Sequence, residues 1–526
     1  MLSFTRSVDE KSQLFLMRTD GGEAQKLSKH KTSVGSYRWS QDGSKIFFVA
    51  AEPRSEEEEK ARKDGDDAIF VDEGPSGQRA GTWNNFWVID VASKEEKRIT
   101  EVDHRIGSFA VSPGADRIAF TSRSENRRNQ QNHSEIRLLD VESGEIRQLT
   151  ENRAPESRLV WAPDGQSLAY TARTDGEWEL MLDKIWIMDP ESGDKRMVSG
   201  AFDGNISTFV WTPDASAILF SGLQGTNNNL FRLDVGSGDV ETLMLDSGLY
   251  RGWRISSDGS TVVYTRSDGD RPDDVWATRN LEAPTRLTDL NPQLDDVALT
   301  HTELVEYLDV DGNTLYGILY YPIDYDPSRK YPLVAEIYER FFDNGFHENM
   351  NLITAQGWFG FRPSVQFEEG YPGEAWLKAV PSAINKLIER GIVDEDQLGV
   401  YGQSYGGYAA NLLITQTDRF AAAANVSGKV NIISFLGDSP KITTRNYAAA
   451  EVGQDRIGAT LWEQPQKYIE HSAVMFADRI ETPLLMLSGE GDWNVPATNQ
   501  REMYYALRRL EKEVVWVHYT AGGHGA

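Results

Sequence analysis

One short pattern recurs through the first half of the chain, and it restricts the fold more than any other feature. A tight turn, usually with Asp and Gly, is followed by a short β-prone run. The turns begin at residues 39, 111, 161, 211 and 255, so successive copies are 72, 50, 50 and 44 residues apart. The copies are Trp39–Gly43, Val111–Ala115, Trp161–Gly165, Trp211–Ala215 and Ile255–Gly259. Such spacing indicates a repeat protein.

A second unit lies between these turns and completes each repeat. It is an apolar strand that ends in Asp, followed by a Ser-Gly or similar turn and a polar strand; its copies are Phe86–Asp90, Ile136–Asp140, Ile185–Asp189 and Leu230–Asp234. Two hairpins in about 45 residues predict one four-stranded blade. We therefore predict a β-propeller of about six blade-like units in residues 1–290. Because Leu2–Arg6 resembles the second half of a hairpin without its turn, we expect this propeller to be incomplete at its N-terminus.

The long first spacing comes from an insertion at roughly Glu52–Gly81. The insertion carries two acidic runs, Glu56–Glu59 and Asp64–Asp67. Charge runs are usually solvated, so the simplest interpretation is an exposed excursion on the propeller rim. The alternative is an acidic patch that meets the amino terminus of a peptide.

The pattern changes after Leu290. Residues 291–300 are expected to form a linker, and residues 301–526 alternate strands with helices. The expected strands include Val305–Leu308, Leu315–Tyr321, Pro332–Tyr338, Leu398–Tyr401, Ala421–Val426, Leu484–Leu487 and Val514–Tyr519, and the expected helices are Ala379–Arg390, Tyr408–Thr415 and Ala497–Leu510. This alternation predicts a mostly parallel sheet covered by helices.

The pentapeptide Gly402-Gln403-Ser404-Tyr405-Gly406 lies between an expected strand and an expected helix. It matches G-x-S-x-G in the context that the nucleophile elbow of an α/β-hydrolase requires. A sharp strand-to-helix turn strains the backbone of the serine, so neighbouring side chains must be absent. We therefore predict that Ser404 is the nucleophile and that the backbone N–H of Tyr405, at a helix N-terminus, stabilises an oxyanion. A glycine-rich structural turn is the alternative.

A serine nucleophile needs a base, and in this fold the acid and then the base follow it along the chain. His518 and His524 are the two histidines beyond Asp492. His518 lies inside an expected strand, whereas His524 lies in a glycine-rich loop just past that strand. We therefore predict His524 as general base. Asp492 follows the strand at Leu484 and is the predicted acid, which orients the imidazole, with Glu490 as the alternative.

Three segments in this order resemble the prolyl oligopeptidase family of serine peptidases. Gly402–Tyr408 resembles the elbow of its dipeptidyl-peptidase branch, Asp492–Pro496 resembles its Asp-x-x-Val-Pro acid segment, and Gly523–Gly525 resembles its histidine loop. The likeness covers nearly the whole chain, a propeller first and then an α/β-hydrolase domain. It implies cleavage of short peptides through an acyl-enzyme, with a propeller that excludes folded proteins.

The resemblance also implies a second oxyanion donor. Tyr338 stands where the family often has a tyrosine hydroxyl that completes the oxyanion hole, although Glu339 and Arg340 replace the usual glycines. Dipeptidyl peptidases of the family grip the free amino terminus with paired glutamates on a propeller insertion. Glu56–Glu59 cannot be matched to them residue by residue, so dipeptidyl-peptidase, acylaminoacyl-peptidase and oligopeptidase activities all stay open.

The residue preference at the scissile bond is not encoded in a motif. Tyr405, Tyr408 and the segment Ser427–Tyr447 are expected to shape the substrate pocket, with Tyr408 as the candidate substrate-binding residue. An esterase of the same fold and a catalytically inert propeller-based binding protein are the alternative functions.

Charge and composition narrow the classes of partner. A formal net charge of -27 argues against nucleic acid, whose binding needs clustered Lys and Arg. There is no cysteine, which excludes disulfides and thiolate chemistry. The sequence contains no run of about 18 apolar residues, so no membrane span is predicted. Histidine spacings typical of metal sites and a phosphate-binding loop are both missing, so we expect neither a metal nor an organic cofactor.

Both ends of the chain lead to expectations about its origin. Only Gly525 and Ala526 follow His524, whereas an α/β-hydrolase normally continues into a helix, so we expect a C-terminally truncated fragment of a longer enzyme. The first residues do not form a signal peptide, which favours the cytoplasm for the chain as given. A periplasmic or secreted location is the alternative if an N-terminal signal has been lost. Homo-oligomerisation also stays open.

Overall fold

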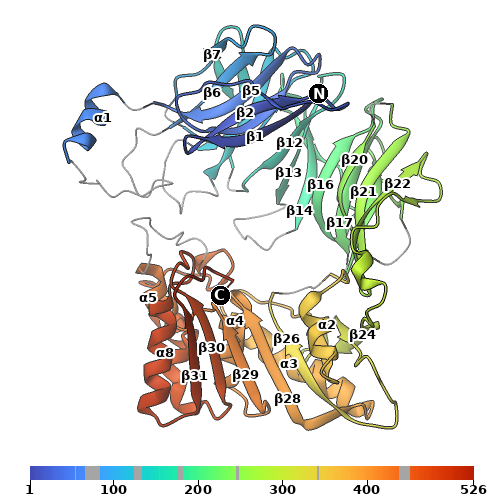
Figure 1. The fold of residues 1–526 in the computed structure, drawn as a ribbon, viewed down its shortest axis with the longest axis vertical. Coiled ribbons are helices and arrows are strands. Elements are labelled where there is room, and N and C mark those ends of the chain that lie inside the picture. The colour runs from blue at the N-terminus through green and yellow to red at the C-terminus, as the bar shows by residue number, and fades with distance from the viewer. Residues whose placement is uncertain are drawn as a thin grey trace. The chain divides into compact units, whose positions relative to one another are not determined.

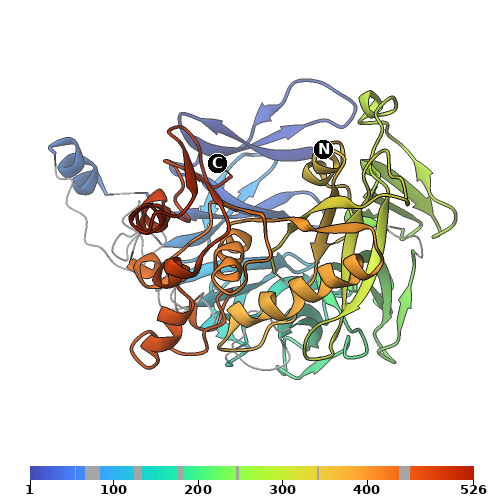
Figure 2. The same ribbon diagram turned by 90° about the horizontal axis from the view of Figure 1, so that it is seen from below.

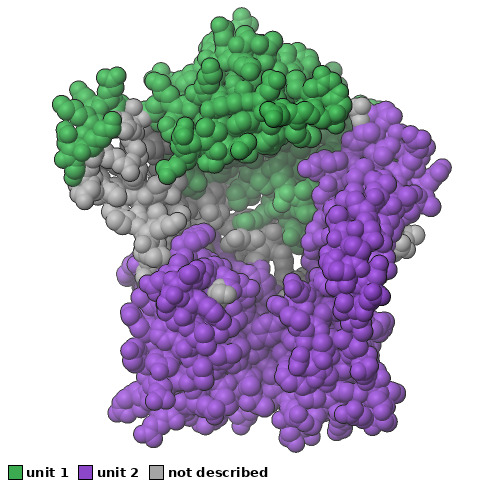
Figure 3. All heavy atoms as spheres, in the orientation of Figure 1, with its two compact units in different colours: residues 1–220, 232–240, 442–444 green, residues 221–231, 241–441, 445–526 purple. Residues whose placement is uncertain are grey.

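The computed structural model describes residues 1–526 except 54, 66–82, 103, 124–132, 153, 174–181, 225, 245–247, 257, 340–342, 438–449 and 526. These residues form two compact units, drawn in different colours in Figure 3. Among the described residues, the first unit comprises those within 1–220 and 232–240, and the second comprises those within 221–231, 241–437 and 450–525.

Most of the first unit consists of small antiparallel sheets that follow one another along the chain (Figure 1). The first sheet has three strands, β1 Leu2–Val8, β2 Lys11–Met17 and β3 Gln25–Lys26. Three four-stranded sheets follow: β4 Val34–Trp39, β5 Lys45–Ala51, β6 Asn84–Asp90 and β7 Glu96–Arg98; β8 Arg105–Val111, β9 Arg117–Arg123, β10 Glu135–Asp140 and β11 Ile146–Gln148; β12 Ser157–Trp161, β13 Leu168–Arg173, β14 Asp183–Met188 and β15 Lys195–Met197.

Two further groups of four strands are joined into one sheet by a single parallel pair, Asn228 with Leu249. Their strands are β16 Asn205–Trp211, β17 Ala217–Gln224, β18 Asn227–Asp234, β19 Val240–Thr242, β20 Leu249–Ile255, β21 Thr261–Asp268, β22 Arg271–Arg279 and β23 Thr285–Arg286. The expected Asp-Gly turns connect the first two strands of a group, and the second unit of the sequence repeat ends at the third strand. The sequence repeat therefore corresponds to the four-stranded sheet.

A hydroxyl recurs at the same place in five of these sheets, and it is buried in all of them except at Thr288, which is half-buried. The hydroxyl oxygen accepts a hydrogen bond from a backbone N–H of a central strand, at 2.8–2.9 Å; the pairs are Ser28 with Leu14, Thr100 with Phe86, Thr150 with Ile136, Ser199 with Ile185, and Thr288 with Val275. Each bond satisfies a backbone donor where the chain turns away from the sheet. Sequence analysis missed this repeat because Ser and Thr are too common to stand out alone.

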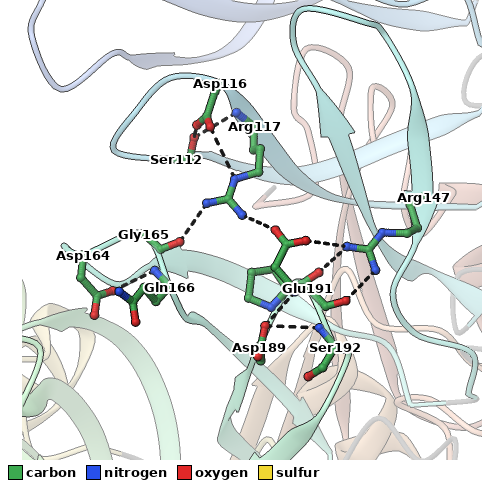
Figure 4. A network of polar contacts seen from close by, with 11 residues as sticks. Ser112, Asp116, Arg117, Arg147, Asp164, Gly165, Gln166, Asp189, Glu191 and Ser192 are labelled. Atoms are coloured by element: carbon green, nitrogen blue, oxygen red, sulfur yellow. Dashed lines mark hydrogen bonds and ion pairs between the residues drawn. The ribbon is translucent and has the colours of Figure 1, made fainter.

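Neighbouring sheets of the first unit are also tied by polar side chains (Figure 4). Arg117 of β9 contacts Glu191 at 2.8 Å and donates to the carbonyl of Gly165 at 3.0 Å. Arg147 of β11 donates to the carbonyls of Pro190 and Glu191. These bonds join the turns of the sheet β8–β11 to those of the sheet β12–β15.

Another sheet of eight strands lies in the second unit, in the order β24-β25-β27-β26-β28-β29-β30-β31. Their bounds are β24 Thr302–Leu308, β25 Thr314–Tyr320, β26 Tyr331–Glu336, β27 Phe359–Pro363, β28 Val393–Gln403, β29 Ala422–Val426, β30 Leu484–Gly489 and β31 Val514–Tyr519. The pairs β24/β25 and β25/β27 are antiparallel and the other five pairs are parallel. The sheet is mostly parallel, as the alternation of strands and helices predicts.

Helices cover this sheet (Figures 1 and 2). They are α2 Glu348–Thr354, α3 Pro372–Glu389, α4 Tyr405–Ile414, α5 Ile432–Gly437, α7 Pro465–Glu470 and α8 Ala497–Arg509, with the 3-10 helix η3 Ala473–Arg479. Helix α4 packs on β28 and β29, and α8 packs on β30 and β31. Helix α4 begins three residues earlier than expected, because the turn at Ser404 leads directly into it. Strand β27 and helix α2 were not anticipated.

The acidic insertion is described only in part. Glu56–Lys63 form helix α1, and the remainder of the insertion from 66 to 81 lies outside the described residues. The expected linker contains η2 at Pro292–Leu294 and leads into β24. Within the described part of the chain, none of the helices has the length and apolarity needed to cross a membrane.

Candidate active site

Ser404 lies in a strained turn between β28 and α4. Its backbone angles are φ 55° and ψ −115°, a conformation that costs a non-glycine residue on the order of 1–3 kcal/mol. The turn is tight enough that a Cβ on Gly402 would lie 2.3 Å from the carbonyl carbon of Gly406, and one on Gly406 would lie 2.2 Å from the Ile337 oxygen. Both glycines of the G-x-S-x-G pattern are therefore required by close backbone contacts.

His524 and Asp492 approach each other from the loops that follow β31 and β30. The Nδ1 atom of His524 is 2.8 Å from Oδ2 of Asp492. The other oxygen of Asp492 accepts hydrogen bonds from the backbone N–H groups of Asn494 and Val495, at 2.8 and 2.9 Å. Asp492 is 1% exposed, so three donors hold a buried carboxylate in one orientation.

The neighbours of His524 define which ring nitrogen carries the proton. The carboxylate of Asp492 can only accept, so Nδ1–H donates to it. The side-chain nitrogen of Asn494 lies 3.3 Å from Nε2 and donates to it. Both contacts favour the neutral tautomer with its proton on Nδ1 and its lone pair on Nε2. Asn494 was not singled out from the sequence, although it lies two residues beyond the predicted acid.

Ser404 and His524 line one cavity of about 590 Å³ at the C-terminal edge of the sheet. Tyr338, Gln403, Gln454 and Asn494 share its wall. A hydrogen bond of 3.4 Å from the amide of Gln403 to the carbonyl of His524 connects the elbow with the histidine loop. These lining residues come from five separate segments of the chain.

Two groups near Ser404 can donate hydrogen bonds to an oxyanion. Tyr405 is the first residue of α4, and the N–H groups in the first turn of a helix have no partner within the helix. The side chain of Tyr338 lines the cavity, and its hydroxyl lies 3.4 Å from the amide nitrogen of Gln454. Burial, with a smaller contribution from the charge of Glu339, raises the pKa of Tyr338, so its hydroxyl stays protonated and able to donate.

A charged cluster forms another part of the cavity wall. The carboxylate of Glu336, at the end of β26, lies 3.0 Å from Arg362 and 3.1 Å from His347. Burial acts to raise the pKa of Glu336, but the contacts with His347 and Arg362 outweigh it and lower that pKa. Sequence analysis missed this cluster because its members come from β26, β27 and the start of α2.

Tyr408 lies away from the cavity. Its ring is 0% exposed and stacks on Tyr405 at 5.4 Å, in the core between α4 and α3. Tyr408 therefore has no exposed surface for a substrate to contact, because helix α4 directs this side chain into the core. The segment Ser427–Tyr447 that was expected to shape the pocket is described only up to 437.

The runner-up residues pair with each other instead of joining this arrangement. Glu490 lies 2.7 Å from Nε2 of His518, and neither residue lines the cavity. The structure thus pairs Glu490, the alternative acid, with His518, the histidine that was not chosen as the base. Among the described residues no group of His, Asp or Glu could hold a metal ion.

This geometry can be compared with known proteins. Residues 371–526 match the sequence model of the prolyl oligopeptidase family, and residues 80–273 match the TolB β-propeller domain. The chain carries a prolyl oligopeptidase family domain. It is a serine-type peptidase that pairs a propeller domain with an α/β-hydrolase domain. The family expected from the three sequence motifs is confirmed.

Relatives of this peptidase extend over most of its length. An uncharacterized peptidase of Bacillus subtilis is 24% identical over 558 residues, which is 98% of this chain and 83% of that protein. Dipeptidyl-peptidase 5 of Porphyromonas gingivalis is 23% identical, over 78% of this chain and 63% of that protein. The crystal structure of acylaminoacyl peptidase from Pyrococcus horikoshii has the same fold, with a TM-score of 0.79 and 19% identity over 99% of this chain and 82% of that one.

Proposed function

We propose that Ser404, His524 and Asp492 are the nucleophile, general base and orienting acid with which this peptidase cleaves short peptides. The observation that carries the proposal is that Ser404 and His524 line the same cavity while His524 hydrogen-bonds the buried Asp492. A nucleophile, a base within the same cavity and a third group that orients the base are the parts that acyl transfer needs.

The proposed reaction begins when Oγ of Ser404 attacks the scissile carbonyl and its proton passes to Nε2 of His524. Asp492 then stabilises the imidazolium through Nδ1–H. The negative charge on the former carbonyl oxygen is stabilised by the Tyr405 N–H, with the Tyr338 hydroxyl as second donor. Collapse of this intermediate transfers the proton to the leaving amine and leaves an acyl-enzyme, which water hydrolyses by the same steps in reverse order.

The substrate class follows from the relatives only as a proposal. Proteins with this fold or related sequence include an acylaminoacyl peptidase, solved also in complex with Z-Gly-Gly-Phe-chloromethyl ketone, and a dipeptidyl peptidase. We propose that this chain acts on peptides of a few residues. The domain boundaries expected from the sequence are proposed as well: a propeller at residues 1–290, a linker at 291–300 and an α/β-hydrolase domain at 301–526.

Hydrolysis of a chromogenic substrate panel tests the proposal. The panel compares free-amino dipeptides, acetylated amino acids, internally blocked peptides and a short acyl ester, each with the native chain and with Ser404→Ala. The proposal predicts peptide turnover that is lost in Ser404→Ala. Turnover of the ester alone would favour the esterase alternative, and binding without turnover would favour an inert binding protein.

A further inference from the structure

A second row of serine, histidine and acid lies beside the proposed active site. Oγ of Ser488 is 3.0 Å from Nδ1 of His518, and Nε2 of His518 is 2.7 Å from Oε2 of Glu490. Ser488 and Glu490 flank the last residue of β30, and His518 is the next-to-last residue of β31. The row therefore spans the ends of two neighbouring parallel strands.

This row cannot act as a second nucleophilic site. Ser488 is 0% exposed, and its Oγ accepts a hydrogen bond from the indole N–H of Trp516 at 2.9 Å. The remaining O–H of Ser488 donates to Nδ1 of His518, which leaves Nε2–H to donate to Glu490. His518 thus has the opposite tautomer to His524, and its lone pair points into the protein instead of toward a substrate.

The row lies where the two loops of the proposed triad begin. The loop after β30 carries Asp492, and the loop after β31 carries His524. These loops are also joined by two backbone hydrogen bonds of 2.9 Å, from Glu490 N to the Tyr519 oxygen and from Gly491 N to the Gly522 oxygen. A Cβ on Gly489 would lie within 2.5 Å of backbone atoms of Gly522 and Gly523, so the loops are in close contact.

We propose that His518 is a positioning residue that fixes the acid loop against the histidine loop, and so sets the geometry between Asp492 and His524. The imidazole lies on β31, the strand that leads into the histidine loop, and it contacts Glu490, the first residue of the acid loop, and Ser488 of β30. This inference rests on the proposed function of Ser404, His524 and Asp492. His518 and Glu490 would affect the reaction through the positions of the two loops and would not take part in it directly.

The contact between His518 and Glu490 is expected to orient the two loops and to add little to the stability of the fold. The side chains of His518 and Glu490 are 28% and 69% exposed, and pairs this open to water contribute little to folding stability. Small errors in the position of a catalytic base are costly, however, since a displacement of about 1 Å can reduce the rate on the order of a hundredfold. Loss of the pair should therefore affect the rate of reaction much more than the stability of the fold.

The chain offers a matched control on the same two strands. Lys512, just before β31, contacts Glu481, just before β30, at 2.6 Å. This ion pair also ties β30 to β31, but at the N-terminal ends of the strands, away from both loops. Lys512→Ala removes a contact of similar type without touching the acid loop or the histidine loop.

The test measures kcat, KM and the rate of inactivation by a fluorophosphonate for His518→Ala, Glu490→Ala, Glu490→Gln, Lys512→Ala and Ser404→Ala. We expect His518→Ala and Glu490→Ala to lower kcat and the inactivation rate about tenfold to a hundredfold with KM within about threefold of the native value. The amide oxygen of Glu490→Gln still accepts from Nε2–H, so this variant should recover most of the loss. Lys512→Ala should match the native enzyme.

The outcomes separate this inference from the proposed function. If Ser404→Ala keeps native activity, the proposed nucleophile is wrong and the inference fails with it. If Ser404→Ala is inactive while His518→Ala and Glu490→Ala behave like Lys512→Ala, only the positioning role is overturned. Should His518→Ala not fold, the comparison of Glu490→Ala with Glu490→Gln decides alone, since Glu490 is exposed; equal kcat values in these two variants would overturn the proposal.

Discussion

Nδ1 of His524 and Oδ2 of Asp492 are 2.8 Å apart, although the two residues are separated by 32 positions in the chain. They meet because β30 and β31 are parallel neighbours, so the loops that follow them leave the sheet at the same edge. The parallel sheet is thus the reason that two short loops can place an acid beside a base. At this distance Asp492 must supply a hydrogen-bond acceptor and His524 must supply the donor at Nδ1.

Asp492→Asn should keep the fold and lose most of the activity. The asparagine amide can donate to Nδ1 and so favour the wrong tautomer of His524, which places the proton on Nε2 where the base is needed. In the Ser-His-Asp template this change costs about 10⁴-fold in kcat, and we expect a loss of on the order of 10³–10⁴-fold here. Steady-state kinetics beside the exposed Asp478→Asn checks this; equal losses in the two variants would contradict the assignment.

Gly406→Ala should damage the elbow. The new Cβ would lie 2.2 Å from the backbone oxygen of Ile337, and a backbone atom cannot move aside as a side chain can. We expect a loss of about 1–3 kcal/mol in the free energy of unfolding, together with lower kcat. Gly437→Ala is the control, because its Cβ meets no atom within 4 Å. Thermal unfolding of both variants provides the measurement, and an unchanged Gly406→Ala protein would refute the close contact.

Removal of the buried partner of Lys429 should be severe. Lys429 and Asp455 form an ion pair in which the side chains are almost inaccessible, beneath the rings of Tyr405 and Tyr408. Asp455→Ala removes the carboxylate of a buried ion pair, which costs about 3–5 kcal/mol in comparable cases. The double variant Lys429→Met with Asp455→Leu should recover most of this loss. Denaturant unfolding tests it; a double variant less stable than Asp455→Ala would argue against the explanation.

The stability of the first unit should depend on the ionisation of Glu156. Burial raises the pKa of this carboxyl to about 7, against the hydrogen bond that Asn152 donates to it at 2.6 Å. The protonated form is therefore favoured in the folded state, and the stability that it contributes is complete below about pH 4.5 and is lost as the pH rises through about 7.

Glu156→Gln removes this titration. We expect the variant to gain on the order of 2 kcal/mol relative to the native chain on going from pH 5 to pH 8.5, because glutamine stays neutral throughout. Unfolding midpoints at the two pH values measure the difference. A constant offset between variant and native protein at both pH values would show that Glu156 does not titrate in this range.

The sequence predicted those parts of the structure that local chemistry determines. The Asp-Gly turns and the strands after them recur at roughly regular spacing, so the sequence alone could locate the sheets of the first unit. The elbow could be located too, because Gly402 and Gly406 are needed by the turn itself. Asp492 and His524 followed from their positions just past predicted strands.

Contacts between distant segments were not predictable in the same way. Asn494 reaches Nε2 of His524 only because two loops fold against each other, and the residues next to Asn494 in the sequence do not predict that contact. Glu336, Arg362 and His347 meet from three elements, two of which were not anticipated. Tyr408 was expected to shape the substrate pocket, but its position on α4 directs its ring into the core.

The most direct test of the account is to find which residue a fluorophosphonate modifies. The native chain is labelled, digested and sequenced by mass spectrometry, with peptide hydrolysis followed in the same sample. The account predicts that a single adduct forms on Ser404 and that hydrolysis falls in proportion to its occupancy. An adduct on another serine, or full peptidase activity in protein whose Ser404 is completely labelled, would contradict it.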